Sequence, residues 1–462
     1  MERTFTGILP AERILTSDAD KAHYGRDWLP DFSPTPSHIL LPKSTDEVQK
    51  IVLYCNEHRI PLVPSGGRTG LSGGATASRN EVVLSLEKMN RVLEVNPIDR
   101  TIRVEAGVVT QKVQDAAKDV GLYFPIEFTT KGSSQIGGNV ATNAGGIRVI
   151  KYGNTRDWVL GMTVVLGDGQ KLSLNGSLFK NQTGYDIKSL LIGSEGTLGI
   201  ITELTLKLTS YPGERVRLVV AIESVTQVLP LLHKVREQFP NLSAFEYFTE
   251  AGLKKVLLHH KLPRPFTTPY PAYVLIEIER RKADLHDELE DGFAALIEES
   301  LILDAIIGSS EKQHEELLSI REKISETLSM HYSPHKNDVS VPVPTIPAFV
   351  VDLEKVLKAE YADFERVIFG HIGDGNLHVN ILKPADLSKA EFLSRCHEVD
   401  NLIFKVVAKY NGSISAEHGV GLLKKEFLHY SRTPEEIALM KAIKRVFDPL
   451  SILNPGKIFD LE

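Results

Sequence analysis

Cysteine is scarce in this chain of 462 residues: only Cys55 and Cys396 occur, far apart and outside any CxxC pair. This excludes a zinc ribbon, a redox pair and a disulfide-stapled secreted domain, and it predicts two reduced thiols in a cytoplasmic protein. Long hydrophobic runs are also missing. Stretches such as 301–307 are too short to span a bilayer, and the N-terminus lacks the pattern of a signal peptide. Peripheral contact with a membrane stays open.

An excess of positive charge is lacking as well. The chain has 53 Lys and Arg against 60 Asp and Glu, a formal net charge of −7, so it lacks the basic footprint of a general nucleic-acid-binding protein. Its 42% hydrophobic and 24% charged residues are ordinary for a soluble globular protein and argue against a disordered chain. The length predicts two to four domains.

The common signatures of nucleotide phosphate binding are missing too. No GxGxxG occurs, so a nicotinamide-binding Rossmann crevice has no support, and no GxxxxGK[ST] occurs, which excludes the P-loop hydrolases. Glycine instead gathers in three segments: PSGGRTGLSGG at 64–74, GSSQIGGNVATNAGG at 132–146 and GSEGTLG at 193–199. Each alone is typical of a loop. Three together, near predicted strand ends, favour a large phosphorylated cofactor held by backbone N–H groups.

Predicted helices and strands alternate without a regular βαβ order. Ser44 and Glu47 have the spacing of a capping box before an amphipathic helix, and 167–169 predicts the turn of a hairpin. A long helix is expected at about 311–331. Tyr-Pro-Gly at 211–213 indicates a domain boundary, because the glycine-rich segments largely end there.

The three glycine segments, the last extended to NQTGYDIKSLLIGSEGTLGIIT, resemble in their order and intervals the FAD-binding domain of the vanillyl-alcohol oxidase type, over about residues 35–210. The resemblance implies an α+β fold: this FAD-binding domain plus a substrate (cap) domain with an antiparallel sheet and flanking helices. It implies FAD, with the pyrophosphate held by backbone amides of the first segment. Some members attach the flavin through a His in that segment. Here Arg68 and Thr69 stand there and no His does, so non-covalent FAD is expected.

The cofactor contacts that the resemblance implies lie in the three glycine segments and near the C-terminus. They are Pro64, Gly66, Gly67, Arg68, Thr69, Gly70, Leu71, Ser72, Gly132, Ser133, Gly137, Gly138, Asn139, Thr142, Asn143, Gly145, Gly146, Glu195, Gly196, Gly199, Ile200, Ile201 and Asn454.

A metal site is predicted by the spacing of two histidines in FGHIGDGNLHVNIL at 369–382. Asp374-Gly375 is a favoured two-residue hairpin turn, which would pair His371 with His378 across the strands, with their Cβ atoms about 5 Å apart. The same pairing puts Asn380 on the His face. Two histidines on a β-ribbon are more often a surface or packing feature, because a catalytic zinc needs three protein ligands.

The segment SAEHGVG at 415–421 offers Glu417 as the third ligand, with His418 beside it. Two His and one carboxylate with open positions fit a catalytic divalent metal, with zinc first and manganese or iron as alternatives.

The C-terminal half also resembles a known family. HIGDGNLHVN, SAEHGVG and DPLSILNPGK look like the D-2-hydroxyacid dehydrogenases, the branch of the flavin family that includes D-lactate, D-2-hydroxyglutarate and glycolate oxidase subunit members. The resemblance implies metal ligands at His371, His378 and Glu417, a catalytic base at His418, and Asn454 near the flavin. We therefore expect an FAD-binding domain at 1–212, a cap domain with the metal-binding hairpin at 213–415, and a C-terminal segment at 416–462 that returns to the flavin.

The substrate carboxylates need cationic partners, and Arg is the best bidentate clamp. Arg321 and Ser325 lie one turn apart on the predicted long helix, and Lys336 precedes NDVSVP. By themselves they are ordinary surface residues. The resemblance implies substrate-binding roles, because members that act on D-2-hydroxyglutarate have an Arg, a Thr four residues on, and a Lys before such a segment. Ser325 replaces that Thr and keeps its hydroxyl. A dicarboxylic substrate, D-2-hydroxyglutarate or D-malate, is expected, with Asn380 assisting; D-lactate or glycolate is the alternative.

Two rival functions stay open. A metal-dependent hydrolase using the two His and Glu417 leaves the glycine segments unexplained, and a non-catalytic flavin-binding subunit of an oxidase complex leaves the metal and base positions unexplained. The expected external electron acceptor is an electron-transfer flavoprotein or a quinone. Related enzymes are often dimers, so a homodimer is a candidate.

Overall fold

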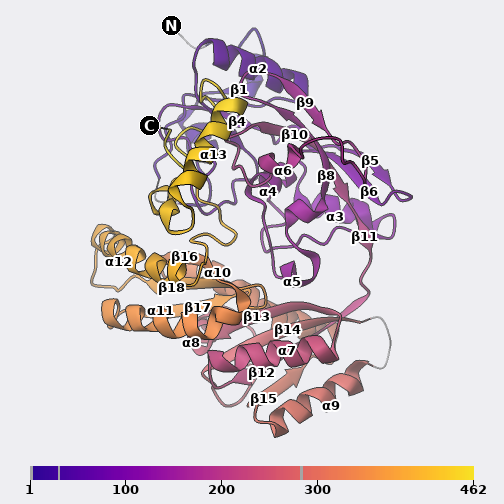
Figure 1. Ribbon diagram of the computed structural model, residues 1–462, viewed down its shortest axis with the longest axis vertical. Coiled ribbons are helices and arrows are strands. Elements are labelled where there is room, and N and C mark those ends of the chain that lie inside the picture. The colour runs from indigo at the N-terminus through magenta and orange to yellow at the C-terminus, as the bar shows by residue number, and fades with distance from the viewer. Residues whose placement is uncertain (1–3, 30–31, 281–284, 462) are drawn as a thin grey trace. The chain divides into compact units, whose positions relative to one another are not determined.

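The computed structural model describes residues 4–29, 32–280 and 285–461 (Figure 1). The chain forms two compact units. The first comprises Met1–Gly145, Gly153–Tyr211 and Glu417–Glu462, and the second comprises Gly146–Tyr152 and Pro212–Ala416. No sequence pattern indicated that the short segment Gly146–Tyr152 belongs to the second unit.

The first unit contains a four-stranded sheet in the order β1-β2-β4-β3. Its strands are β1 (Ile14–Leu15), β2 (His38–Leu40), β3 (Leu62–Ser65) and β4 (Val82–Ser85). Strands β2, β4 and β3 are parallel, so a crossover must connect β2 to β3, and helix α2 (Thr45–Glu57) provides it. The predicted cap is confirmed, because the Ser44 side chain accepts a hydrogen bond from the Glu47 N–H. The apolar face of α2 is buried in the core of the unit.

An antiparallel sheet in the order β5-β6-β10-β8-β9 completes the framework of the first unit. Its strands are β5 (Val92–Asn96), β6 (Thr101–Glu105), β8 (Val159–Val165), β9 (Lys171–Leu174) and β10 (Ile200–Lys207). The predicted hairpin around residues 167–169 is confirmed, since Val165 pairs with Lys171 across it.

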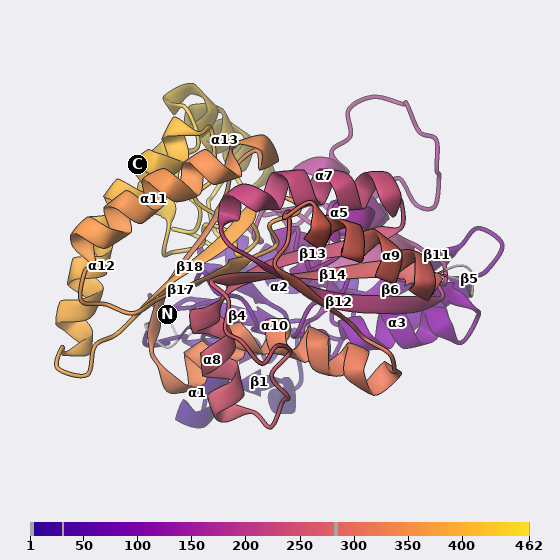
Figure 2. The same ribbon diagram turned by 90° about the horizontal axis from the view of Figure 1, so that it is seen from below.

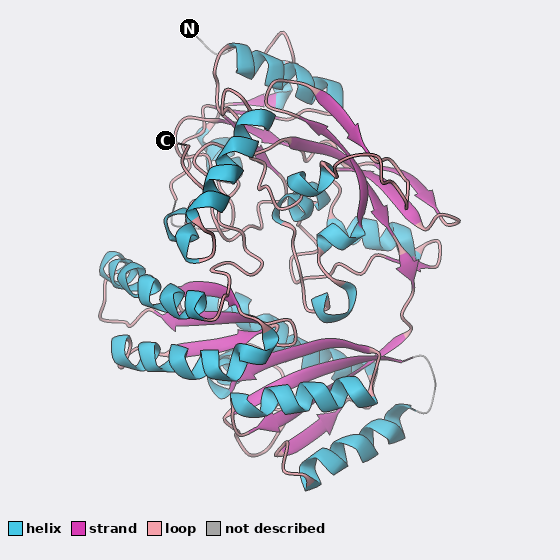
Figure 3. Cartoon of the chain, in the orientation of Figure 1, coloured by secondary structure: helices cyan, strands magenta, loops and turns pink. Residues whose placement is uncertain are grey.

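Short strands, helices and long loops connect these sheets (Figure 3). The remaining elements of the first unit are η1 (Ala11–Arg13), α1 (Asp18–Tyr24), α3 (Thr110–Lys118), β7 (Leu122–Tyr123), α4 (Ile136–Thr142), η2 (Thr155–Trp158), α6 (Lys188–Leu191), β11 (Thr209–Ser210), η5 (Lys425–Tyr430) and α13 (Pro434–Phe447).

The second unit is built on one seven-stranded sheet, antiparallel throughout, in the order β15-β12-β14-β13-β17-β18-β16. Its strands are β12 (Glu214–Ile222), β13 (Leu242–Thr249), β14 (Ala272–Arg280), β15 (Asp304–Ile307), β16 (Pro334–Ser340), β17 (Arg366–Gly370) and β18 (Asn376–Leu382). This confirms the expected α+β fold with an antiparallel sheet in the second domain.

Helices cover both faces of this sheet (Figure 2). Helices α8 (Glu250–His259) and α10 (Glu311–His331) pack their apolar residues on one face. The opposite face is covered by α7 (Val228–Gln238), α9 (Leu285–Glu298), α11 (Ile346–Glu360) and α12 (Lys389–Lys409) (Figure 2). The short pieces η3 (Val225–Gln227), η4 (Val343–Thr345) and α5 (Val149–Tyr152) complete the unit. No helix within the described ranges is long and apolar enough to cross a membrane.

The predicted two-residue turn between β17 and β18 is wrong. Strand β17 ends at Gly370 and β18 begins at Asn376, and Phe369 rather than His371 is paired with His378. The five intervening residues form a wider loop, in which the His371 carbonyl accepts hydrogen bonds from the N–H groups of Asp374 and Asn376. These local bonds satisfy the backbone without a tight turn at Asp374-Gly375.

A buried charge cluster fixes α5 to the sheet of the second unit. Glu277 of β14 is completely buried, and its carboxylate accepts hydrogen bonds from Arg148 at 2.7 and 2.8 Å, from Arg217 at 2.9 Å and from Ser243 at 2.8 Å. Burial alone would raise the pKa of Glu277, but the charge of Arg148 and the neighbouring arginines hold it well below its usual range. The cluster therefore stabilises the folded unit only while Glu277 is ionised.

We predict that Glu277→Ala strongly destabilises the second unit. The substitution leaves Arg148 and Arg217 buried without their carboxylate, a loss of about 3–5 kcal/mol in the free energy of unfolding. Urea unfolding followed by circular dichroism measures it. Glu354→Gln, which removes a partly exposed i,i+4 pair with Lys358, is the control and should change the midpoint little. Similar midpoints for the two variants would contradict the prediction.

Candidate functional site

The first glycine segment follows β3 and presents a row of backbone donors. Among the described residues, no acceptor is found for the N–H groups of residues 67–72, whereas the N–H of Gly73 donates to Asp27 at 2.7 Å. Backbone N–H groups seldom lack partners in folded proteins, so a row of them indicates a site for an anionic group. This arrangement fits the diphosphate of FAD.

Two glycines show how closely the segments pack. A Cβ on Gly67 would lie 2.3 Å from the Ser133 carbonyl oxygen, whereas a Cβ on Gly138 would meet no protein atom within 4 Å. Buried polar atoms without a partner occur in the same unit: Ser65 Oγ, Gln135 Oε1 and Asn454 Oδ1. Orphaned buried polar atoms are costly, and a polar ligand would satisfy them.

Several expected cofactor contacts have partners within the protein. The Asn139 side chain donates to Thr110 at 2.6 Å, and the Glu195 carboxylate accepts from the N–H groups of Val420 and Gly421 at 2.7 and 2.8 Å. The Asn454 amide donates to the Glu195 carbonyl at 2.7 Å. Glu195 therefore fixes the loop that follows His418, a role that the sequence did not indicate.

Some of the other expected cofactor contacts pack closely against protein atoms, and others are exposed. Gly137 and Gly199 leave room for the side chains of Ala106 and Val164, and all the expected contacts except Gly146 lie in the first unit.

We predict that Gly138→Ala leaves the fold intact and weakens FAD binding by about tenfold or more, because its methyl group has free space in the protein but would intrude on a closely approaching pyrophosphate. Flavin absorbance per polypeptide after dialysis measures retention. Gly7→Ala, which also meets no atom within 4 Å, is the matched control. Full flavin retention by Gly138→Ala would place the cofactor elsewhere.

A polar patch lies at one edge of the sheet in the second unit. Strands β16 and β18 pair Lys336 with Asn380 and Asp338 with His378. Residues two apart on a strand, and their direct cross-strand partners, share one face of a sheet. All four side chains therefore lie on the face that α10 covers. The expected alignment of Asn380 with His378 is confirmed, because both lie on β18 two residues apart, although no tight hairpin precedes that strand.

Lys336 lies against hydroxyl groups of α10. Its Nζ is 2.7 Å from Ser329 Oγ and 3.4 Å from Ser325 Oγ. Burial lowers the pKa of Lys336 to about 8, and within the described parts of the chain no carboxylate forms an ion pair with it. This buried ammonium has only neutral partners, which favours the arrival of an anion.

Arg321 lies on the same face of α10 and is only 4% exposed. Its guanidinium stacks over Phe369 at 4.7 Å, and its Nη2 lies 2.8 Å from Glu246 Oε2. That contact is a close ion pair without hydrogen-bond alignment, since Nε and Nη2 of Arg321 both lack an acceptor among the described atoms. The two donors suit a bidentate contact with a carboxylate.

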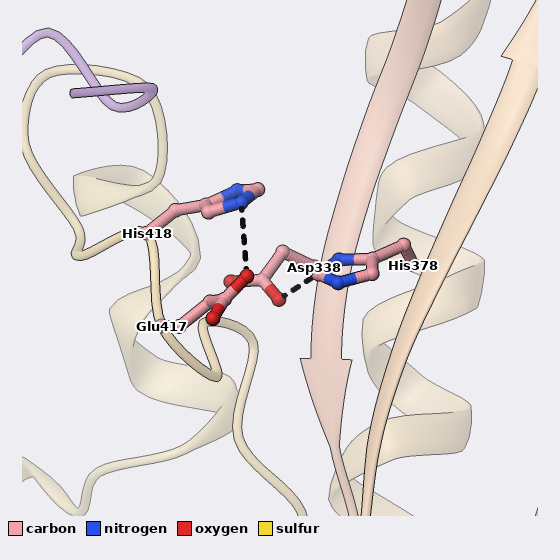
Figure 4. A group of neighbouring side chains, drawn as sticks. All are labelled: Asp338, His378, Glu417 and His418. Atoms are coloured by element: carbon pink, nitrogen blue, oxygen red, sulfur yellow. Dashed lines mark ion pairs between the residues drawn. The ribbon is translucent and has the colours of Figure 1, made fainter. Parts of the chain in front are cut away.

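One group of side chains in the described part of the chain has the composition and spacing of a metal site. It consists of Asp338, His378, Glu417 and His418, whose potential ligand atoms all lie within 4.8 Å of one another (Figure 4). Asp338 Oδ1 is 3.4 Å from His378 Nδ1, and Glu417 Oε1 is 3.7 Å from His418 Nε2. The N–H of Ala416 donates to the backbone oxygen and the Oδ2 of Asp338, which brings the following residue, Glu417, to this strand.

The structure brings together two of the three expected ligands, His378 and Glu417, and adds Asp338. His371 stands outside the group: its ring centroid is 5.4 Å from that of His378, and its Nδ1 is 2.9 Å from Glu246 Oε1. Nitrogen and carboxylate donors of this kind fit zinc or another divalent transition metal.

Sequence reasoning missed Asp338, Glu246 and Ser329. Asp338 comes two residues after Lys336, and that spacing would place both side chains on one face of a strand. Glu246 lies far from the motifs in sequence, and nothing local distinguishes it from the other acidic residues.

Two protein families match different parts of the chain. Residues 36–175 match the family described as FAD binding domain, and residues 211–458 match the family described as FAD linked oxidases, C-terminal domain. The chain is 50% identical over 448 residues to the D-2-hydroxyglutarate dehydrogenase of Stutzerimonas stutzeri (strain A1501), which covers 97% of this chain and 96% of the relative.

A second relative is the D-2-hydroxyglutarate dehydrogenase of Xanthomonas citri pv. viticola, 47% identical over 452 residues, with 98% of this chain and 95% of the relative covered. The solved structure of p-cresol methylhydroxylase with substrate bound aligns at a TM-score of 0.79 and 16% identity over 99% of this chain and 96% of the other. That likeness shows a common fold.

Proposed function

This chain belongs to the FAD-linked oxidases, and we propose that it oxidises a dicarboxylic D-2-hydroxy acid, D-2-hydroxyglutarate or D-malate, to the 2-oxo acid. The two bacterial relatives, named D-2-hydroxyglutarate dehydrogenases, match nearly the whole chain and support this substrate class. The reaction removes a hydride and a proton from the hydroxy acid, which together amount to two electrons and two protons.

The observation that supports a dicarboxylate is the presence of two buried cations, Arg321 on α10 and Lys336 on β16 against the same helix, whose hydrogen-bond donors are not matched by acceptor anions. Arg321 has two buried donors without an acceptor, and Lys336 has only serine hydroxyls as partners. A buried charge is costly unless it is paired. A substrate with a carboxylate at each end satisfies both cations, whereas D-lactate satisfies one.

Each residue has a chemical role in this proposal. Arg321 binds one carboxylate with two parallel hydrogen bonds, and Lys336 binds the other as a point charge supported by Ser325 and Ser329. Asn380, whose amide donates to the Val367 carbonyl at 3.3 Å, lies opposite Lys336 and offers its oxygen to the substrate. His418 accepts the proton of the substrate hydroxyl as general base.

FAD supplies hydride acceptance when bound, and a divalent metal, with zinc the first candidate, supplies Lewis acidity toward the substrate oxygens. His378, Glu417 and Asp338 would hold the metal, and His371 beside them is proposed as a further ligand. An electron-transfer flavoprotein or a quinone would be the external electron acceptor.

We predict that Lys336→Met depresses kcat/KM for D-2-hydroxyglutarate by roughly 30-fold or more, because loss of one partner of a desolvated ion pair costs about 2–5 kcal/mol. D-lactate, with a methyl group in place of the second carboxylate, should be affected much less. Steady-state kinetics with a dye acceptor measures both substrates.

Lys312→Met, at an exposed position of α10, the helix whose serines contact Lys336, is the matched control and should change neither rate. Equal losses for the two substrates, or a wild-type preference for D-lactate, would show that the dicarboxylate assignment is wrong.

We also predict that His378→Ala or Glu417→Gln removes the metal and lowers kcat by about two orders of magnitude or more, since a Lewis acid contributes several kcal/mol. The flavin spectrum should stay nearly unchanged, because neither residue belongs to the glycine segments. Elemental analysis and flavin absorbance report the two cofactors separately. His397→Ala, at an exposed position of α12, is the control. A metal-free variant with normal turnover would remove the metal from the mechanism.

A further inference from the structure

Glu246 lies between Arg321 and His371 and contacts both. It lies on β13, whose register pairs Tyr247 with Gly370, so Glu246 is directed toward the next residue along, His371. The Glu246 side chain is 1% exposed. Its Oε1 and Oε2 are each 2.9 Å from His371 Nδ1, and Oε2 is also 2.8 Å from Arg321 Nη2.

We propose that Glu246 is a positioning residue whose single carboxylate orients both the metal-side His371 and the substrate-side Arg321. The inference rests on the proposed function, because it assigns those two residues to metal and substrate. Acceptance of a hydrogen bond from Nδ1–H fixes the imidazole tautomer with Nε2 unprotonated, which is the state that a metal ligand requires. The second oxygen holds the guanidinium in place over Phe369 by charge.

A carboxylate is the group that this position requires. Both of its oxygens accept, so one can face a ring N–H while the other faces a guanidinium. A glutamine has one acceptor and one donor end. Its oxygen would face the charged Arg321, the stronger partner, and its NH2 would then face His371 Nδ1. Nδ1 must become the acceptor, the ring proton moves to Nε2, and that nitrogen no longer binds a metal.

Glu246→Gln, studied in the full-length FAD-loaded protein, is therefore expected to alter two separate measurements. The dissociation constant for Zn²⁺, from competition with a chromophoric chelator, should rise roughly 10- to 100-fold. At saturating Zn²⁺, the KM for D-2-hydroxyglutarate should rise about tenfold, since Arg321 loses a charged partner, with a smaller effect on kcat.

Glu250→Gln is the matched control. Glu250 follows β13 directly and also pairs with an arginine, Arg264, at 2.6 Å, but it contacts neither Arg321 nor His371 among the described contacts. Its substitution should leave both measured constants at wild-type values. If Glu246→Gln does not fold, Glu246→Asp replaces it: the charge stays, but the side chain is one methylene too short to reach both partners, so the same two constants should rise by smaller factors.

The outcomes separate this inference from the proposed function. A change in the Zn²⁺ constant alone, in the KM alone, or in neither, overturns the proposal that one carboxylate serves both residues. A wild-type protein that needs no metal, or that does not oxidise D-2-hydroxyglutarate or D-malate, overturns the proposed function itself. A wild type with both properties and an unaffected Glu246→Gln variant overturns the role of Glu246 alone.

Discussion

The register between β16 and β18 is the constraint on which the polar patch depends. It sets Lys336 opposite Asn380 and Asp338 opposite His378, so four polar side chains occupy one face of a sheet edge. A shift of one residue would turn Lys336 and Asp338 toward the opposite face and bring His335 and Asn337 to the patch. The opposite face fixes this register: the buried Asp400 of α12 accepts hydrogen bonds from His335 at 2.8 Å and from Asn337 at 3.0 Å.

Buried charges have different consequences in two parts of the second unit. At Glu277 the buried carboxylate is surrounded by arginines and a serine, so its demand for hydrogen bonds is met and the cluster serves stability. Lys336 has only hydroxyl partners, and Arg321, although ion-paired with Glu246, keeps Nε and Nη2 without a hydrogen-bond acceptor among the described atoms, which favours an anionic ligand. The difference between satisfied and unsatisfied charge is what distinguishes a structural cluster from a binding site here.

Local signals in the sequence allowed much of the fold to be predicted. The Ser44 cap, the hairpin around 167–169 and the long helix α10 were all predicted from spacing, because caps, turns and amphipathic periods depend on neighbours within a few residues. The prediction of a tight turn between β17 and β18 was wrong, because it also rested on a local preference alone. Asp374-Gly375 favours a tight turn locally, but in the structure the His371 carbonyl accepts hydrogen bonds from the N–H groups of Asp374 and Asn376, and the segment forms a wider loop.

The sequence by itself determined the glycine-rich segments, the order of the two domains and the candidates His378 and Glu417, since these follow from motifs in which nearby residue types carry the chemistry. Arg321 and Lys336 became candidates through the family resemblance that those motifs carry. Only the tertiary structure decided which candidates meet. It placed Asp338 with His378 and Glu417, left His371 beside Glu246, and brought Ser329 to Lys336. Such contacts join strands and helices that are distant in the chain, and their geometry depends on register and helix packing, which no local pattern specifies.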